Sequence, residues 1–328
     1  MKRKFVPHLI TAIAAVTLLA LGVASGSATT GKATKEADVT WNEGMTIGVT
    51  RITNDNLAKN WVRVSPDGTK ILYTEASPNG YWQIVYLRDA NNPAKTPLIG
   101  EIAHSPSWYE DSNRFIYVSY ESGAGRLVRS NVSGSGKTYI SRAPIGQYGD
   151  YFPSVKNGII AFTALENNRY TIATVKENGT EATFLVEGRS PSWHPQENKI
   201  VYIKNEKDPF NYGGDIYELD PQTGQFSQIY SDPKYFCYEP SYSPDGKQIL
   251  FTKGTAVRAT GTKNKTAVSE ETIKRHIFIM NADGTNVSPV SSGNATVTSP
   301  SWGLNGEVFC LVSIGKGREI YKLRIRGE

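Results

Sequence analysis

The chain has 328 residues, of which 20% are charged, and it is well supplied with glycine (30), tyrosine (18) and proline (17). Its formal net charge of +5 includes Lys2, Arg3 and Lys4, so the rest of the chain is nearly neutral. This composition is typical of a turn-rich all-β protein, and it argues against a disordered chain and against a basic surface for nucleic acid.

The first 28 residues read as a secretory signal peptide. Basic residues come first, an apolar run from Leu9 to Ala24 follows, and small residues up to Ala28 offer a cleavage position. The apolar run is shorter than the roughly 20 residues that a membrane-spanning helix needs. We therefore predict a cleaved leader, a periplasmic or secreted location, and no membrane span afterwards. Residues 29–44 are small and polar, which predicts a flexible lead-in.

A thirteen-residue pattern, Glu239 to Phe251, then proves to be one of six copies. It predicts a short strand, a tight turn at Ser243-Pro-Asp-Gly246, and a second strand that ends in an aromatic residue. Proline sets the φ of the second turn position, and glycine supplies the positive φ that closes the turn. The position that tryptophan holds in three copies is filled in chain order by Val64, Trp108, Val155, Trp193, Tyr242 and Trp302.

Each copy continues into two more strand-like segments. The predicted third strands are Ile84–Leu87, Leu127–Val128, Tyr170–Ile172, Ile216–Leu219, Ile277–Met280 and Ile320–Leu323. The predicted fourth strands are Thr96–Ile99, Thr138–Ile140, Ala182–Leu185, Phe226–Ile229 and Val287–Val290. Four strands per unit and a period of about 40 to 50 residues are the sequence pattern of β-propeller blades.

The sixth unit lacks a fourth strand of its own, and the strand predicted at Val49–Thr53 has no other partner. We therefore predict an all-β, six-bladed β-propeller over residues 45–328, with four antiparallel strands per blade and a ring closed by the N-terminal strand joining the last blade. Residues 253–275 form an insertion in unit five. Two interpretations stand: a solvated loop, or a basic flap over one face.

The Ser-Pro-Asp-Gly turn and the Ile-Tyr-x-Leu third strand (Ile216–Leu219 and Ile320–Leu323) resemble the WD40-like repeat of the TolB family. They also resemble the N-terminal propellers of prolyl oligopeptidase and dipeptidyl peptidase-type proteins. The resemblance covers roughly residues 45 to 326 and implies the propeller fold. TolB proteins carry an α/β domain before the propeller and the peptidases a hydrolase domain after it; we expect neither here. A Gly-x-Ser-x-Gly nucleophile motif is absent from the sequence.

The resemblance also implies a loop face, formed by the loops that enter the first strands and those that join second to third strands. Exposed aromatic and arginine side chains are common contact anchors. Partner-binding residues are predicted there at His104, Asp150, Tyr151, Arg189, Tyr238, Glu239, Trp82 and Tyr212. The repeated tryptophans are predicted to pack blade on blade, and Asp67, Asp245 and Asp283 to shape turns.

No catalytic residues, metal ligands or cofactors are predicted, because the histidines fall in different units. Cys237 and Cys310 either pair or are two small buried residues.

Three functions compete. The first is a non-catalytic, monomeric, exported scaffold that binds a protein or peptide of the bacterial cell envelope. The second is a polysaccharide-active enzyme or carbohydrate-binding propeller, with Asp150, Glu239, Asp208 and His104 as candidate site residues. The third is an accessory module for an outer-membrane partner.

Overall fold

The computed structural model describes residues 38–76, 83–89, 95–205, 213–255 and 274–326. All regular elements among these residues are β-strands. The described part of the chain has no helix of the length and apolar character that crossing a membrane requires.

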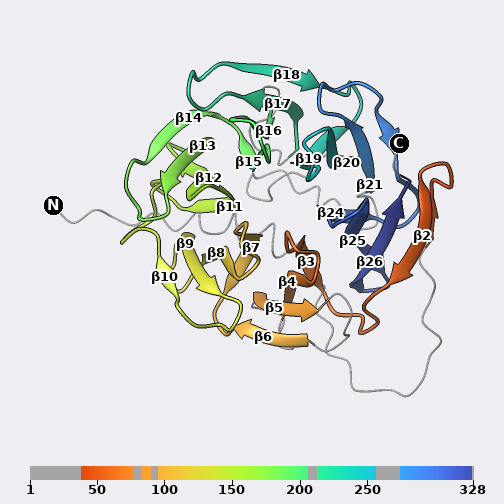
Figure 1. The fold of residues 1–328 in the computed structure, drawn as a ribbon, viewed down its shortest axis with the longest axis horizontal. Coiled ribbons are helices and arrows are strands. Elements are labelled where there is room, and N and C mark those ends of the chain that lie inside the picture. The colour runs from red at the N-terminus through yellow and green to blue at the C-terminus, as the bar shows by residue number, and fades with distance from the viewer. Residues whose placement is uncertain (1–37, 77–82, 90–94, 206–212, 256–273, 327–328) are drawn as a thin grey trace, which may run out of the picture.

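Six four-stranded antiparallel sheets surround a central axis (Figure 1). From the axis outward, the first three sheets are β3 (Lys59–Val64), β4 (Lys70–Ala76), β5 (Gln83–Asp89) and β6 (Lys95–Ile99); β7 (Ala103–Trp108), β8 (Arg114–Ser119), β9 (Arg126–Asn131) and β10 (Thr138–Tyr139); and β11 (Asp150–Lys156), β12 (Ile159–Glu166), β13 (Arg169–Lys176) and β14 (Thr183–Glu187). The other three are β15 (Arg189–Trp193), β16 (Ile200–Lys204), β17 (Asp215–Leu219) and β18 (Phe226–Tyr230); β19 (Phe236–Tyr242), β20 (Gln248–Gly254), β21 (Arg275–Asn281) and β22 (Ser288–Pro289); and β24 (Val297–Trp302), β25 (Glu307–Ile314), β26 (Gly317–Ile325) and β2 (Thr46–Arg51). The predicted class, a propeller of four-stranded antiparallel sheets, is confirmed.

The sixth sheet joins the two ends of the described chain. β2 pairs with β26 in an antiparallel register that places Val49 opposite Leu323. The predicted closure by an N-terminal strand is therefore confirmed. β2 supplies the outermost strand of this sheet, and it pairs with the edge of β26 that would otherwise be open.

A second, two-stranded sheet adds to this junction. β1 (Val39–Trp41), which lies inside the stretch predicted as a lead-in, pairs with β23 (Ser291–Gly293). The side chains of Val39, Trp41 and Met45 pack against the apolar cluster between the fifth and sixth sheets. The sequence indicated no strand at β1, because three residues are too few for a periodic pattern.

Packing between neighbouring sheets forms the core. Trp108 of the second sheet packs with Leu72 of the first, and its indole N–H donates to the carbonyl of Arg63 at 3.0 Å. Trp302 donates in the same way to the carbonyl of Ser241 at 3.2 Å. The prediction that these tryptophans join one repeat to the next is confirmed.

The turns behave as their sequence predicts. In the pattern at residues 243–246, the Asp245 carboxylate accepts hydrogen bonds from the hydroxyl of Ser243 at 2.6 Å and from the N–H of Lys247 at 3.1 Å. Gly246 has φ 76°, and a Cβ there would meet the ring of His194 at 2.4 Å. Glycine is thus required both for the backbone angle and for the close approach.

The leader, most of the lead-in and most of the insertion at 253–275 lie outside the described residues. Those three predictions stay predictions.

Candidate functional site

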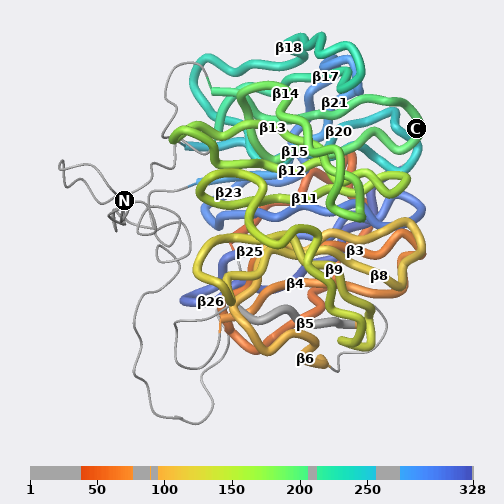
Figure 2. Tube along the Cα trace, turned by 90° about the vertical axis from the view of Figure 1, so that its left-hand side faces the viewer, coloured from red at the N-terminus to blue at the C-terminus, as the bar shows by residue number. Residues whose placement is uncertain are grey.

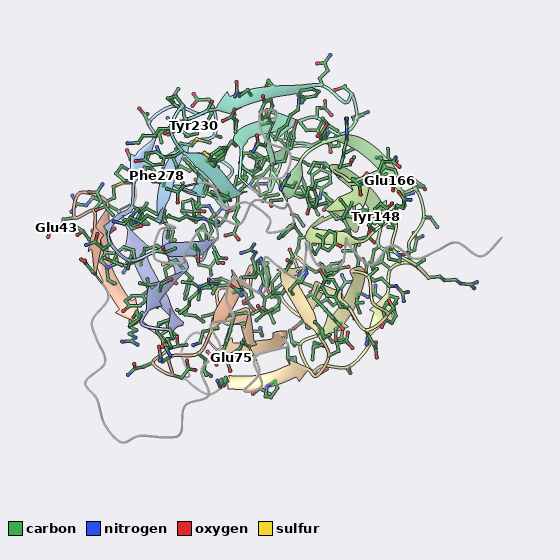
Figure 3. The ribbon with its side chains drawn as sticks, turned by 180° about the vertical axis from the view of Figure 1, so that it is seen from behind. Glu43, Glu75, Tyr148, Glu166, Tyr230 and Phe278 are labelled. Carbon is green, nitrogen blue, oxygen red and sulfur yellow. The ribbon has the colours of Figure 1, made fainter. Side chains whose placement is uncertain are left out.

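Where the inner strands begin, one end of the axis collects side chains from all six sheets. Because the sheets are antiparallel, the loops that lead into the inner strands share this end with the loops that join second to third strands. We call this end the loop face. Figure 2 shows the ring from the side, with the strands running through its thickness. Tyr148 and Glu166, neighbours in Figure 3, belong to this face on the third sheet.

All six inner strands carry the same β-bulge near this face. Two residues of each inner strand stand opposite a single residue of the second strand, as Glu239 and Pro240 do opposite Phe251. The first bulge residue has φ between 49° and 54° in every sheet, although none of the six is glycine. A bulge bends the strand and redirects its side chains, and a left-handed residue costs about 1 kcal/mol. Six repetitions indicate a required feature of the ring.

The six first bulge residues form what we call the axial ring. Its members are, in sheet order, Trp61, Ser105, Phe152, Ser190, Glu239 and Ser299. Large side chains and serines alternate around it. Trp61, Phe152 and Glu239 are half-buried, while the residues that follow them are buried. The ring centroid of Trp61 lies 4.9 Å from that of His104, and Phe152 packs against the apolar cluster between the second and third sheets. The N–H of Trp61 donates to the hydroxyl of Ser299 at 3.2 Å, which links neighbouring members.

Two residues further along each inner strand lies a second ring, which we call the serine ring. It consists of Arg63, Ser107, Ser154, Ser192, Ser241 and Ser301. Its hydroxyls tie sheets together: Ser301 accepts from the N–H of Val64 at 3.1 Å, and Ser154 from that of Trp193 at 3.1 Å. Arg63 is the one charged member.

Arg63 and Glu239 interact electrostatically, although they come from the first and fifth sheets. Burial lowers the pKa of the Arg63 guanidinium, and the carboxylate of Glu239 acts in the opposite direction. The guanidinium donates to the carbonyl of Val62 at 2.8 Å. The Oε2 atom of Glu239 is buried and has no hydrogen-bond partner among the described residues. The loop face therefore contains a carboxylate oxygen that lacks a donor.

Of the predicted site residues, His104 lies within a group of aromatic rings. Its ring centroid is 4.9 Å from those of Trp61 and Tyr120 and 6.1 Å from that of Tyr151. Both ring nitrogens have partners, the hydroxyl of Tyr120 at 2.5 Å and that of Ser105 at 2.9 Å. Burial lowers its pKa to about 3, so the imidazole is neutral at physiological pH.

Asp150 and Tyr151 begin the third inner strand. The Asp150 carboxylate is fully buried and accepts the N–H groups of Ile145 at 2.8 Å and Gly146 at 2.7 Å. Burial raises its pKa to about 7, although those two hydrogen bonds act against the shift. Tyr151 donates its hydroxyl to the carbonyl of Tyr148 at 3.1 Å. Both residues fix the conformation of the loop at 145–149.

Arg189 and Tyr238 occupy the matching positions in the fourth and fifth sheets. The guanidinium of Arg189 lies 4.2 Å from the ring centroid of Tyr170. Tyr238 donates to the carbonyl of Thr255 at 2.9 Å, and the guanidinium of Arg275 lies 3.9 Å from its ring centroid. These cation–π contacts hold the two arginines against the loop face.

Five of the predicted residues are therefore not exposed anchors, and their part in partner binding stays a prediction. His104, Asp150, Tyr151, Arg189 and Tyr238 are all buried, because they precede the bulge and their side chains pack within and between sheets. Glu239 alone among the described candidates is half-buried and belongs to the axial ring. The last two candidates, Trp82 and Tyr212, lie outside the described residues, as does Asp208, a candidate of the carbohydrate hypothesis.

Trp61, Phe152 and Arg63 were not predicted from the sequence. The sequence does mark the axial position, because it is the residue before the proline of the repeated Ser-Pro-Ser motif. In the first and third copies an aromatic replaces that serine, and in the fifth a glutamate does. An alignment of the six repeats at this position shows the alternation of large residues and serine.

The histidine, cysteine and acidic side chains indicate neither a metal site nor a disulfide among the described residues. Among the described residues no three or more His, Cys, Asp or Glu side chains are grouped so that they could hold a metal ion. Cys237 and Cys310 are free thiols, both buried, and burial raises their pKa. Of the two alternatives for the cysteines, the structure has the buried, unpaired one.

Comparison with known proteins finds curated sequence relatives among the Tol-Pal system proteins. No protein-family model matches the chain. The Tol-Pal system protein TolB of Francisella tularensis subsp. holarctica is 24% identical over 262 residues, which are 68% of this chain and 57% of that protein. The chain thus spans little more than half the length of the curated relatives it matches.

Solved structures agree in fold. A structure assigned as TolB from Agrobacterium tumefaciens has a TM-score of 0.61 at 13% identity, over 90% of this chain and 100% of that one. A gluconolactonase from Xanthomonas campestris has a TM-score of 0.59 at 10% identity, over 91% of this chain and 99% of that one. At such identities the likeness concerns the arrangement of strands, which both proteins share with this chain.

Proposed function

We propose that this chain, which has the β-propeller fold of the TolB-type proteins, is an exported scaffold that binds a protein or peptide of the bacterial cell envelope through its loop face. The observation that carries this proposal is the axial ring. Six sheets repeat one strained bulge near the loop face, and three of its first residues, Trp61, Phe152 and Glu239, are large and half-buried.

The side chains of the loop face fit partner binding better than catalysis. A catalytic acid or base needs a proton that it can exchange with a substrate. The carboxylate of Asp150 is held by two backbone N–H groups, and both nitrogens of His104 are occupied by hydroxyls. These two candidates of the carbohydrate hypothesis therefore serve the scaffold, while the exposed parts of the half-buried Trp61 and Phe152 side chains offer contact area.

The location rests on the sequence. The basic start, the apolar run to Ala24 and the small residues to Ala28 support export. The sequence likeness to a Tol-Pal system protein supports a place in the envelope.

A photo-cross-linking experiment tests the proposal with a matched pair of positions. Tyr148 on the loop face and Leu304 on the opposite face are each 39% exposed. A photoreactive phenylalanine analogue at each position is incubated with envelope extract and irradiated. We expect one defined protein adduct from position 148, suppressed by excess unlabelled chain, and none from position 304.

Adducts from both positions in equal amount, or from neither, would contradict a loop-face partner. The carbohydrate hypothesis retains one favourable observation, because half-buried aromatic side chains and a half-buried glutamate at the same end of the ring also suit a sugar ring. If it is right, a purified envelope saccharide suppresses the adduct at position 148 and binds the chain when no protein is present.

A further inference from the structure

A methionine side chain lies where the two ends of the ring are joined. The sequence contains three methionines: Met1 belongs to the predicted leader, Met280 has no exposed surface, and Met45 is half-buried. Met45 belongs to the turn between β1 and β2, as does Glu43, which Figure 3 labels at the outer rim. Of the two methionines that the structure describes, only Met45 therefore has exposed surface.

Hydrogen bonds fix the backbone of this turn to both neighbouring sheets. The N–H of Met45 donates to the carbonyl of Asn42 at 3.0 Å, and the carbonyl of Met45 accepts from the N–H of Arg326, just beyond β26, at 2.6 Å. The side-chain amide of Asn42 donates to the carbonyl of Pro289 in β22 at 2.8 Å. A displacement of Met45 is thus transmitted to the fifth sheet and to the sixth.

The side chain of Met45 helps to anchor the N-terminal segment. It packs, together with Val39 and Trp41 of β1, against the apolar cluster between the fifth and sixth sheets. The apolar side chains of β2 add little burial, because Ile47 and Val49 remain 53% and 41% exposed. The anchorage of the segment therefore depends on the apolar character of the residues around β1, Met45 among them.

A thioether is a two-electron reductant, and a peroxide oxidises it to a sulfoxide. The sulfur forms a bond to one peroxide oxygen, the O–O bond breaks, and the other oxygen leaves as water. The product is polar, so it disrupts apolar packing where the thioether did not. Cys237 and Cys310 are poor competing targets, because both are buried and burial raises their pKa.

From this placement we infer that Met45 is a site of oxidation by hydrogen peroxide, and that its sulfoxide loosens the N-terminal closure of the ring. The polar sulfoxide leaves the apolar cluster, and the pairing of β1 with β23 weakens. β23 lies in the loop that leads into the inner strand β24, so the change reaches the loop face. The inference goes beyond the proposed function, because it holds for the chain without any partner.

Peroxide treatment of the purified chain tests the inference. Peptide mass spectrometry should show the gain of one oxygen at Met45 at least about tenfold faster than at Met280, because exposure governs the reaction. The oxidised chain should unfold at a temperature roughly 2 to 6 °C lower. Amide hydrogen exchange should become faster in residues 38–51 and 291–293. A methionine sulfoxide reductase should reverse both changes.

Two variants separate oxidation of Met45 from general damage by peroxide. Met45→Leu keeps an apolar side chain without sulfur, and it should fold normally and lose the response to peroxide. Met45→Gln places a polar group at the same position, and it should unfold at a lower temperature without peroxide. The matched control is Met280→Leu, which should keep the full response.

Resistance of Met45 to peroxide in the folded chain, or equal oxidation of Met45 and Met280, would overturn the inference. An oxidised chain with unchanged unfolding temperature and unchanged hydrogen exchange would do the same. A response that persists in the Met45→Leu variant would assign the effect to another residue and would also overturn it. The cross-link at position 148 tests the proposed function separately, because it is measured without peroxide.

Discussion

The carboxylate of Asp150 shows how one buried group shapes the loop face. It has no exposed surface, and its hydrogen bonds from Ile145 and Gly146 hold the loop that carries Tyr148. A free aspartic acid ionises near pH 3.9, whereas burial raises the pKa of Asp150 to about 7. Between these values the folded chain keeps a proton that the unfolded chain has lost. Stability from this group is therefore complete below about pH 4 and falls as the pH rises toward 7.

Asp150→Asn should remove this pH dependence, because the amide has no proton to lose. Relative to the variant, the unchanged chain should lose roughly 1 to 3 kcal/mol of unfolding free energy between pH 4.5 and pH 7.5. Urea unfolding at several pH values measures the unfolding free energy of both proteins. Asp245→Asn is the control, since the hydroxyl of Ser243 lowers the pKa of that exposed carboxyl and its contribution is lost as pH falls. Parallel pH profiles for both variants would refute the prediction.

At the scale of elements, a buried ionic cluster fastens β26 to the segment between β2 and β3. Lys59 and Glu319 have no exposed surface, and Lys59 Nζ lies 3.5 Å from a carboxylate oxygen of Glu319. That carboxylate also accepts from the hydroxyl of Thr53 at 2.5 Å and the N–H of Asn56 at 2.6 Å. Lys59 makes a second ion pair, with Asp55. The cluster ties together residues about 260 positions apart in the chain.

Glu319→Gln should destabilise the protein by roughly 2 to 4 kcal/mol, since it takes one of two carboxylate partners from the buried Lys59 charge and also the ion pair from Arg51. Breaking a buried pair outright costs about 3 to 5 kcal/mol. Equilibrium unfolding in urea measures the loss. The matched control is Glu187→Gln, whose partner Arg169 is exposed and 3.5 Å away, and which should cost less than about 0.5 kcal/mol. Equal costs for the two variants would show that the buried cluster has no special role.

The strands were predictable because their signals are local and repeated. Alternating apolar residues and the Ser-Pro-Asp-Gly turn placed the second strands, and six copies overcame the weakness of any one. The bulges were not predictable, because the residue before a proline favours extended backbone and a non-glycine residue avoids positive φ. The site depended on those bulges. Without them, His104 and Arg189 seemed as accessible as Glu239, whereas only Glu239 stands at a bulge position and is half-buried.

At the scale of the whole molecule, the ring depends on its two terminal segments. β2 covers the edge of β26, β1 pairs with β23, and the backbone N–H of Arg326 donates to the carbonyl of Met45 at 2.6 Å. Pairing across such a sequence distance was predictable from counting strands, since the sixth unit lacked one. The contribution of β1 was not predictable from the sequence, because its apolar residues contact a cluster that exists only in the closed ring.

Deleting residues 38–51 from the exported chain should therefore open the ring. The loss of apolar burial by Val39, Trp41 and Met45, together with the β2 ladder, should lower the unfolding free energy by roughly 3 to 6 kcal/mol. The exposed edge of β26 should cause oligomers to form. Calorimetry measures the loss of stability, and light scattering detects the oligomers.

A synthetic peptide of residues 38–53 added to the deletion variant should restore the monomer and much of its stability, because the missing strand pairs with the open edge. The matched control is the same peptide with Val49→Pro, which lacks one N–H and cannot pair along its length. A deletion variant that stays monomeric and unfolds as the intact chain does would show that closure by β2 is dispensable. Rescue by the proline peptide to the same extent would show that strand pairing is not its mechanism.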